Sequence, residues 1–208
     1  MFSDIYYFQM KNEIFESFNQ NNFSKLVNAT QPLWSYPEWE DSFRNFYTEI
    51  IIRNSYFDND IAYQMISQKE KELLSVIFFQ KKSDKNHIHK WILENSQTFT
   101  LQQKECIKMC VEYLDFMEKK VHAIMNEDDI KLSLFLTIKK GYGAKIFENY
   151  WYQLMESGFK NMYLWTDCEC NWKWYQQKGF TLVEEATYSQ FNDEKHEFKT
   201  YIFKKQIT

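Results

Sequence analysis

Residues 132–146 read LSLFLTIKKGYGAKI, and this stretch decides the fold of the chain. Residues 130–138 are too apolar for an exposed strand, so we expect a buried β-strand there. Gly141 and Gly143 come next, and a helix is expected from these glycines to Glu156. A strand that passes through glycines into a helix leaves several backbone N–H groups of the first helical turn without partners. The junction is therefore the first candidate for a ligand-binding site.

The electrostatics of this junction favour an anion. The helix dipole places partial positive charge on the free N–H groups, so the turn can hold a phosphate or pyrophosphate. Lys139, Lys140 and Lys145 add positive charge, and glycine allows the backbone to approach a ligand closely. The P-loop pattern G-x-x-x-x-G-K-[ST] is missing, and Ile146 replaces the third glycine of G-x-G-x-x-G, which disfavours both nucleotide-binding motifs. A tight strand-to-helix turn without a ligand stays open as the alternative.

Glycine is used sparingly in this chain. There are four glycines, at positions 141, 143, 158 and 179, whereas average usage of about 7% would give about fifteen. All four lie in the last third of the chain, so we expect a requirement of backbone geometry at these places. Gly158 is well placed to end the preceding helix in the left-handed conformation.

Hydrophobic periodicity gives the remaining elements. The expected elements are a strand at 4–10, a helix through 13–18, a helix that begins near Pro37 and includes 43–50, a hairpin of strands 61–67 and 73–80, a helix at 101–125, a strand at 161–165, a short helix at 171–178, and strands at 180–188 and 196–204. The order is β-α-α-β-β-α-β-α-β-α-β-β. It predicts an α+β (α/β layered) fold with a central mixed sheet flanked by helices.

Domain organisation follows from the lack of any linker-like stretch. Residues 1–208 are expected to form a single domain, and residues 81–129 to form a helical insertion between the third and fourth strands.

Composition excludes several classes of protein. With 44% hydrophobic and 26% charged residues the chain resembles an ordinary globular protein, and 19% aromatic residues predict an aromatic core or pocket. The net charge of −4 lacks the basic character expected of a nucleic-acid binder. We find no membrane span and no signal peptide, so a cytoplasmic protein without a membrane partner is expected. The four cysteines, without a C-x-x-C pair, predict free thiols and no metal site.

Two segments together resemble a known family. Residues 134–147, from the strand through the glycine turn, resemble motif A of the GNAT superfamily of N-acetyltransferases. Residues 158–180, GFKNMYLWTDCECNWKWYQQKGF, are similar to that family's G-h-x-x-h-x-L-x-T … N … hYxxxGF segment. The resemblance covers about 130–204, and the hairpin at 61–80 matches the second and third GNAT strands. The first 60 residues match only in the order of their elements. The chain departs from the family at Ile138, where Arg or Gln is preferred.

The resemblance implies acetyl-CoA-dependent transfer of an acetyl group to a primary amine, on a small molecule or a peptide. The pantetheine arm would pair with the fourth strand where it separates from the fifth, and the pyrophosphate would lie on the turn at 140–145. A backbone N–H of the fourth strand would polarise the oxyanion, and Tyr175 would protonate the leaving thiolate as general acid. The implied cofactor-binding residues are Leu136, Thr137, Ile138, Lys140, Gly141, Tyr142, Gly143, Ala144, Lys145 and Asn171.

Plainer interpretations of individual residues stay open. Tyr175 is by type an aromatic packing residue, and Asn171 is suited to cap the short helix after it. Glu127, Asp128 and Asp129 either include a general base or form a solvated turn.

Two other functions also stay open. One is an acyl-CoA-binding sensor or interaction module of the same fold without turnover, and the other is an interaction protein that uses the aromatic N-terminal half. The residues that select the acceptor are expected in the first two helices and in residues 81–129. The sequence does not distinguish a homodimer from a monomer.

Overall fold

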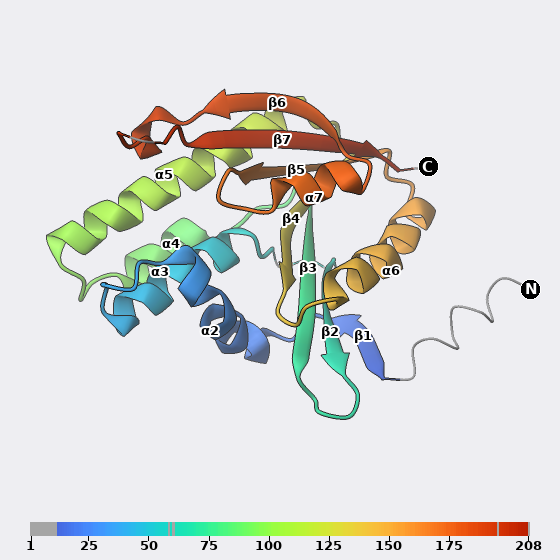
Figure 1. The fold of residues 1–208 in the computed structure, drawn as a ribbon, viewed down its shortest axis with the longest axis horizontal. Helices are drawn as coiled ribbons and strands as arrows, with labels where there is room; N and C mark the ends of the chain where they lie inside the picture. Colours follow the sequence, from blue (N-terminus) through green and yellow to red (C-terminus); the bar gives the residue numbers. More distant parts are fainter. Residues whose placement is uncertain (1–11, 58, 60, 195, 208) are drawn as a thin grey trace, which may run out of the picture.

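A seven-stranded mixed sheet forms the centre of the protein (Figure 1). The structure is a computed structural model and describes residues 12–57, 59, 61–194 and 196–207. The strand order is β1-β2-β3-β4-β5-β7-β6, in which β4 and β5 are parallel and the other neighbours are antiparallel. The strands are β1 Glu13–Ser17, β2 Ala62–Ser67, β3 Leu73–Lys81, β4 Ile130–Thr137, β5 Asn161–Asp167, β6 Thr181–Thr187 and β7 Lys199–Gln206. The α+β layered fold with a central mixed sheet is confirmed.

Helices cover both faces of the sheet. They are α2 Phe23–Trp34, α3 Asp41–Asn54, α4 Ile88–Asn95, α5 Leu101–Ile124, α6 Tyr142–Glu156 and α7 Trp172–Gln177, with short 3₁₀ helices at Gln20–Asn22 and Ser189–Phe191. α6 and α7 pack on one face, which we call the α6 face. α2, α3 and α5 pack on the other, the α5 face, where α2 lies against β2–β4 and α5 against β5 and β7. The two faces therefore have separate apolar cores.

Several predicted elements are confirmed by the structure. The hairpin of β2 and β3 has no glycine in its turn, and Lys71 takes the left-handed conformation instead (φ +56°). Residues 81–129 contain α4 and the long helix α5, so the insertion is helical as expected. Gly158 follows α6 with φ +78°, as predicted for a glycine that ends a helix.

The N-terminal region is where sequence and structure differ most. The expected strand at 4–10 lies outside the described residues. Residues 13–18, expected to be helical, form β1 instead, because the backbone of Glu13–Ser17 pairs with β2. α2 was not predicted, and it contains Pro32 in its last turn. Short segments with few apolar residues carry little periodicity, so the pairing partner decides their conformation.

The start of α3 also needs correction. Pro37 was expected at the beginning of this helix, whereas α3 begins at Asp41 after the N-cap residue Glu40. The predicted apolar face is nevertheless present, since Phe43, Phe46 and Ile50 are buried.

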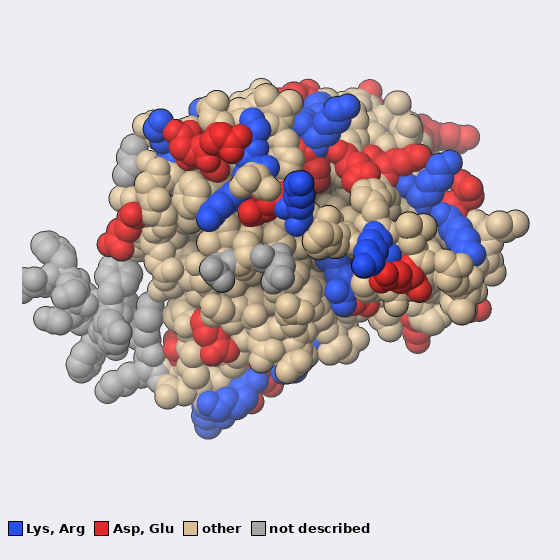
Figure 2. All heavy atoms as spheres, turned by 180° about the vertical axis from the view of Figure 1, so that it is seen from behind, with Lys and Arg blue, Asp and Glu red and all other residues tan. Residues whose placement is uncertain are grey.

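The surface shows charges of both signs. On the face seen from behind in Figure 2, acidic and basic side chains are interspersed. All four cysteines are unpaired. Of the helices in the described residues, none combines the length and apolar character that a membrane crossing requires.

The N-terminus of α5 provides a test of the fold. Thr100 and Gln103 form a capping box in which each side chain accepts a hydrogen bond from the other's backbone N–H, at 3.2 and 2.9 Å. Thr100→Ala removes one of these bonds and should lower the free energy of unfolding by about 1 kcal/mol. The melting temperature should fall by about 2–4 °C in calorimetry. Thr98→Ala, two residues earlier, is the control, and an equal effect of both changes would contradict the role of the cap.

Candidate active site

β4 and β5 are parallel neighbours that pair over a short stretch only. Their register joins Ile130 to Met162 and Lys131 to Tyr163, and no further pair follows among the described residues. β4 stays paired with β3 as far as Thr137, and β5 stays paired with β7 to its end. In Figure 1, β4 consequently runs down the page while β5 runs across it. The edge of β4 that faces β5 is left without a strand partner beyond these pairs.

A β-bulge at Ser133 redirects the second half of β4. The adjacent β3 residues Phe78 and Phe79 pair with Leu134 and Leu132, so Ser133 is an extra residue. Its hydroxyl donates to two backbone carbonyl oxygens on the α5 face, at 2.8 and 3.1 Å. A bulge bends the strand and changes the direction of the side chains that follow it. The strand therefore turns at the place where β4 and β5 separate.

Leu136, Thr137 and Ile138, at the end of β4 and directly after it, were expected to contact the pantetheine arm, and their backbone groups point in different directions. Ile138 donates its N–H to the carbonyl of Leu74 at 3.0 Å, and the carbonyl of Leu136 accepts from a serine hydroxyl of β3 at 2.7 Å. Both groups therefore point toward β3. Because backbone groups alternate along a strand, those of Thr137 and Phe135 point toward β5. Of the three expected residues, Thr137 has backbone groups that can form hydrogen bonds with a ligand in the gap. Phe135 is a new candidate for the same reason.

Gly141 makes the turn from β4 into α6. Its φ of +94° lies in the left-handed region, and it is the N-cap residue of α6. Among the described residues no side-chain hydrogen bond caps this end of the helix. Tyr142 donates its N–H to the carbonyl of Lys139 at 3.3 Å, and the other N–H groups of the first turn have no intrahelical partner. A Cβ at Gly141 would meet no atom within 4 Å, so the space beside the turn is open. Of the other predicted turn residues, Lys140 and Lys145 are exposed, and Tyr142 and Ala144 are half-buried.

Gly143 is required for a different reason. A Cβ at this position would lie 2.2 Å from Oγ1 of Thr137 and 3.2 Å from Cζ of Phe135. The first turn of α6 therefore packs directly on the end of β4. The sequence suggested that this glycine allows a phosphate to approach, and the structure adds a second reason for it, the packing of the helix on the strand.

The three lysines near the turn are not equivalent. Lys139 forms ion pairs with Glu70 and Glu72 at 3.4 and 3.5 Å, and Lys145 pairs with Glu13 at 2.7 Å. Lys140 takes part in none of the ion pairs found in the described part of the chain. It is therefore the lysine best able to offer its charge to an anionic ligand.

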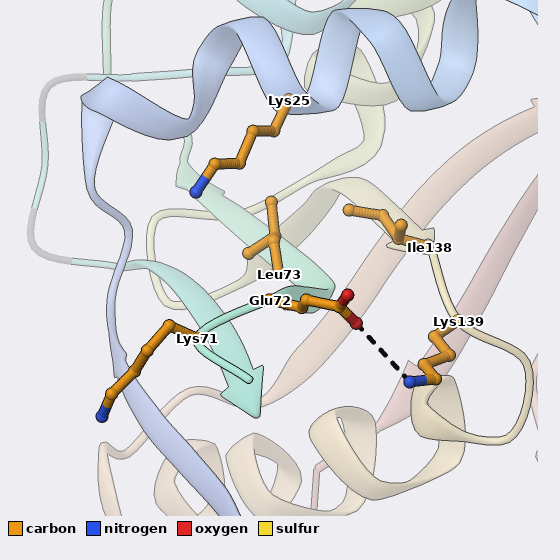
Figure 3. Close-up of a pocket in the computed structure, with 6 residues that line it drawn as sticks. All are labelled: Lys25, Lys71, Glu72, Leu73, Ile138 and Lys139. Atoms are coloured by element: carbon orange, nitrogen blue, oxygen red, sulfur yellow. Dashed lines mark ion pairs between the residues drawn. The ribbon is translucent and has the colours of Figure 1, made fainter. Parts of the chain in front are cut away.

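A pocket of about 490 Å³ lies at the end of β4 on the side of α2 (Figure 3). Leu73 and Ile138 form its apolar wall, and Lys25 of α2 lies across from them. The Glu72–Lys139 ion pair marks its edge. The pocket thus borders the turn but opens on the face opposite α6.

Tyr175 and Asn171 lie on the α6 face, at the end of β5. The Tyr175 ring packs against Trp174, Phe180 and Phe203 with centroids 5.4 to 6.1 Å apart, as the packing interpretation expected. Its hydroxyl, however, takes part in none of the hydrogen bonds found in the described residues. Burial and the nearby Cys170 raise the pKa of the Tyr175 phenol, so it holds its proton at neutral pH. Asn171 is exposed and its side chain makes no capping bond, which leaves the carboxamide available.

The acidic residues before β4 form a structured turn. Asp129 is buried and accepts hydrogen bonds from the N–H of Asn126 at 2.8 Å and from Nδ2 of Asn161 at 2.6 Å. Asp128 forms an ion pair with Lys160. This turn precedes the first residue of β4, at the opposite end of the strand from the gap. The three residues thus form a turn, as one interpretation expected, but the turn is not solvated throughout, since Asp129 is buried.

Sequence reasoning missed a buried polar network on the α5 face, beside the last β4–β5 pair. Lys131 of β4 is fully buried, and its ammonium group contacts the carboxylate of Glu118 of α5 and, at 3.0 Å, Oε1 of Gln80. Trp165 of β5 donates its indole N–H to the same carboxylate at 2.8 Å. Burial lowers the pKa of Lys131, whereas the negative charge of Glu118 raises it, and the effect of burial is the larger. The sequence holds one sign of this network, which is a lysine, Lys131, within an otherwise apolar strand.

A second missed carboxylate is Asp167, the last residue of β5. It accepts a hydrogen bond from the Tyr113 hydroxyl of α5 at 3.1 Å and from the N–H of Glu169 at 3.1 Å. Burial is the main cause that raises its pKa above the usual range of an aspartate. Asp167 belongs to the GNAT-like segment 158–180, but the sequence pattern indicated no role for it.

Comparisons with known proteins agree with this geometry at the level of the fold. The arylalkylamine N-acetyltransferase 2 of Aedes aegypti superposes with a TM-score of 0.55 at 14% identity, covering 95% of this chain and 100% of that one. The ribosomal-protein-S18-alanine N-acetyltransferase of Escherichia coli superposes with a TM-score of 0.51 at 12% identity, and the match covers 94% of each chain. The C-terminal condensation domain of Ebony, in complex with beta-alanyl-dopamine, superposes with a TM-score of 0.58 at 8% identity. The match covers 94% of this chain and 99% of that one.

The sequence comparisons give no relative. No protein-family model and no curated protein sequence matches the chain. The structural similarity nevertheless extends over nearly the whole chain, and the neighbours include N-acetyltransferases that act on different amines. The protein therefore has the fold of the GNAT N-acetyltransferases.

The packing of Gly143 can be tested by stability. Gly143→Ala should lower the free energy of unfolding by about 1–3 kcal/mol, because the added methyl group overlaps the Thr137 side chain. Thr137→Ala in the same chain removes the overlapping oxygen and should restore most of the loss. A double-mutant cycle in urea measures this coupling. Strictly additive effects would contradict the contact.

Proposed function

We propose that this protein is an acetyl-CoA-dependent N-acetyltransferase that acts on a primary amine of a small molecule or peptide. The observation that carries the proposal is the gap between β4 and β5, which leads to the uncapped N-terminus of α6. An unpaired strand edge suits an amide-containing chain, and an uncapped helix end suits a phosphate group. A CoA thioester has both parts in one molecule. The shared fold with N-acetyltransferases supports the same assignment.

The residues present are suited to hold such a ligand. Thr137 would offer its backbone groups to the pantetheine arm, and the first turn of α6 after Gly141 would hold the pyrophosphate with help from Lys140. Asn171 would hydrogen-bond the arm near its sulfur end. Acetyl-CoA supplies an acetyl group that is already activated, as a thioester, toward attack by an amine.

Tyr175 would act as the general acid. Its phenol carries its proton at neutral pH, as an ordinary tyrosine does, and its hydroxyl has no hydrogen-bond partner among the described residues. The hydroxyl can therefore donate to a departing thiolate, although burial, which raises its pKa, makes it a weaker acid. The surrounding aromatic rings hold the Tyr175 ring in place.

Function does not follow from the fold alone. A binding module without turnover and an interaction protein remain the alternatives, and two measurements separate the three. Release of CoA together with acetylation of an amine would support the enzyme. Binding of acetyl-CoA without turnover of any amine would indicate the module, and failure to bind acetyl-CoA would indicate the interaction protein.

Ligand-induced stability tests cofactor binding without an acceptor. If acetyl-CoA binds only the native state, a concentration one hundred times its dissociation constant should add about 2.7 kcal/mol to the free energy of unfolding. The melting temperature should rise by about 5–10 °C, scaled from 2–4 °C per kcal/mol. ATP and NAD are the controls and should have much smaller effects, since neither has a pantetheine arm. An equal shift with ATP would indicate a nucleotide site instead.

The proposed acid can be tested by deleting one oxygen atom. Tyr175→Phe keeps the aromatic packing and should lower kcat about 100-fold, the lower end of the range for general acid catalysis. The apparent affinity for acetyl-CoA should change little, because the interaction is made mainly in the transition state. Steady-state kinetics with an active amine measures both, and Tyr152→Phe on the exposed side of α6 is the control. A stable variant with full turnover would remove Tyr175 from the mechanism.

A further inference from the structure

Two carboxylates line the α5 face near the separation of β4 and β5, and they differ in how their charge is balanced. Glu118 is paired with the buried ammonium group of Lys131. Asp167 receives hydrogen bonds from neutral donors only, the hydroxyl of Tyr113 and the backbone N–H of Glu169 among them. None of the ion pairs in the described part of the chain involves Asp167. A half-buried carboxylate without a cation is uncommon, because buried acidic groups are normally paired.

Asp167 lies at the end of β5 that is separated from β4. It is the last residue of β5, four positions beyond Tyr163, where the pairing with β4 ends. Its contact with Tyr113 puts its side chain on the α5 face, whereas Tyr175 approaches the same end of β5 from the α6 face. Cys170 lies within electrostatic range of both groups. The unpaired carboxylate and the proposed acid therefore lie on opposite faces of the sheet near the same end of β5.

We propose that Asp167 binds the ammonium group of the acceptor and accepts its first proton. This inference rests on the proposed acetyltransferase function and names the group that the proposed function lacks, the one that generates the free amine. A cationic amine supplies the positive charge that Asp167 does not receive from the protein. The preferred acceptors are thus amines that are protonated at neutral pH.

The proton balance of the reaction is then complete. Asp167 takes one proton from the ammonium group and passes it to water. The neutral nitrogen forms a bond to the acetyl carbon as the carbon–sulfur bond breaks, and the sulfur takes the phenolic proton of Tyr175. The second proton lost by the nitrogen restores the phenol. The products are the amide, the free thiol and one released proton.

The surroundings of Asp167 set the pH at which it can act. The titratable groups that face it are Tyr113 of α5, Tyr201 of β7, and Cys168, Glu169 and Cys170 of its own turn. The pKa of Cys170 is raised to about 12 and that of Tyr113 is also raised, so both are neutral at pH 7. Burial shifts the pKa of Asp167 upward, closer to neutral pH, where a general base is most effective.

The experiment compares Asp167→Asn with the control Glu169→Gln, an exposed acidic residue two positions away. Asparagine can still accept the hydrogen bonds of Tyr113 and Glu169, so the turn should be kept, and the melting temperature checks this. The probes are acetyl-CoA with phenethylamine, agmatine and an alanine-initiated peptide, and the readout is thiol release together with mass of the product. We expect kcat/KM for the amine to fall at least 100-fold at pH 7 in Asp167→Asn and to stay normal in Glu169→Gln.

The pH profile separates a proton acceptor from a structural residue. In the wild type, kcat/KM should rise with pH as Asp167 loses its proton. In Asp167→Asn the deficit should shrink as the pH approaches the pKa of the free amine, which is about 10 for phenethylamine and agmatine by analogy with lysine and about 8 for the α-amino group of the peptide. Tyr113→Phe removes a donor that stabilises the charged carboxylate, so the pKa of Asp167 should rise further and the acidic side of the profile should move to higher pH.

The outcomes are distinguishable. Equal kcat/KM of the wild type and Asp167→Asn overturns the role of Asp167 and leaves the acetyltransferase function standing. A deficit in Asp167→Asn that does not change with pH overturns the role of proton acceptor. Acetyl-CoA binding in calorimetry without acetylation of any probe amine overturns turnover, and the role of Asp167 with it.

Discussion

β3 holds β4 on one side along its whole length, whereas β5 holds it on the other side over two residue pairs only. The candidate site depends on this imbalance. A strand that is fully paired on both edges has no backbone groups left for a ligand, and a strand without a second neighbour would be an ordinary sheet edge. Here β5 is carried away by its own pairing with β7, so β4 gains an unpaired edge inside the molecule.

Two contacts fix the geometry around this gap. On the α6 face, the first turn of α6 rests on Thr137 so closely that a Cβ at position 143 would overlap the Thr137 side chain, and this contact places the start of the helix at the end of β4. On the α5 face, Glu118 joins Lys131 of β4 to Trp165 of β5 beside their last pair. The helical insertion is thus anchored to both of the strands that form the gap.

The distribution of charge then separates the two halves of the site. At the turn, Lys139 and Lys145 are neutralised by glutamates, so the helix end and Lys140 remain for an anion. At the end of β5, Asp167 forms none of the ion pairs found in the described residues, and Tyr175 holds its proton. Such a separation of charge would suit the proposed transfer from a CoA thioester to an ammonium-bearing acceptor.

The sequence by itself determined the elements that carry strong local patterns. The apolar run at 130–138, the glycines and the long stripe of α5 predicted β4, the turn, α6 and α5, and the two GNAT-like segments predicted the gap. Local pattern failed for β1 and α2, where short segments are decided by what they pair or pack with. Only the tertiary structure assigned Gly143 to packing, turned Leu136 and Ile138 toward β3, and brought Glu118, Lys131 and Asp167 to one face. The physical reason is that backbone conformation depends on neighbouring residues, whereas the direction of a strand edge and the pairing of a buried charge depend on residues distant in the chain.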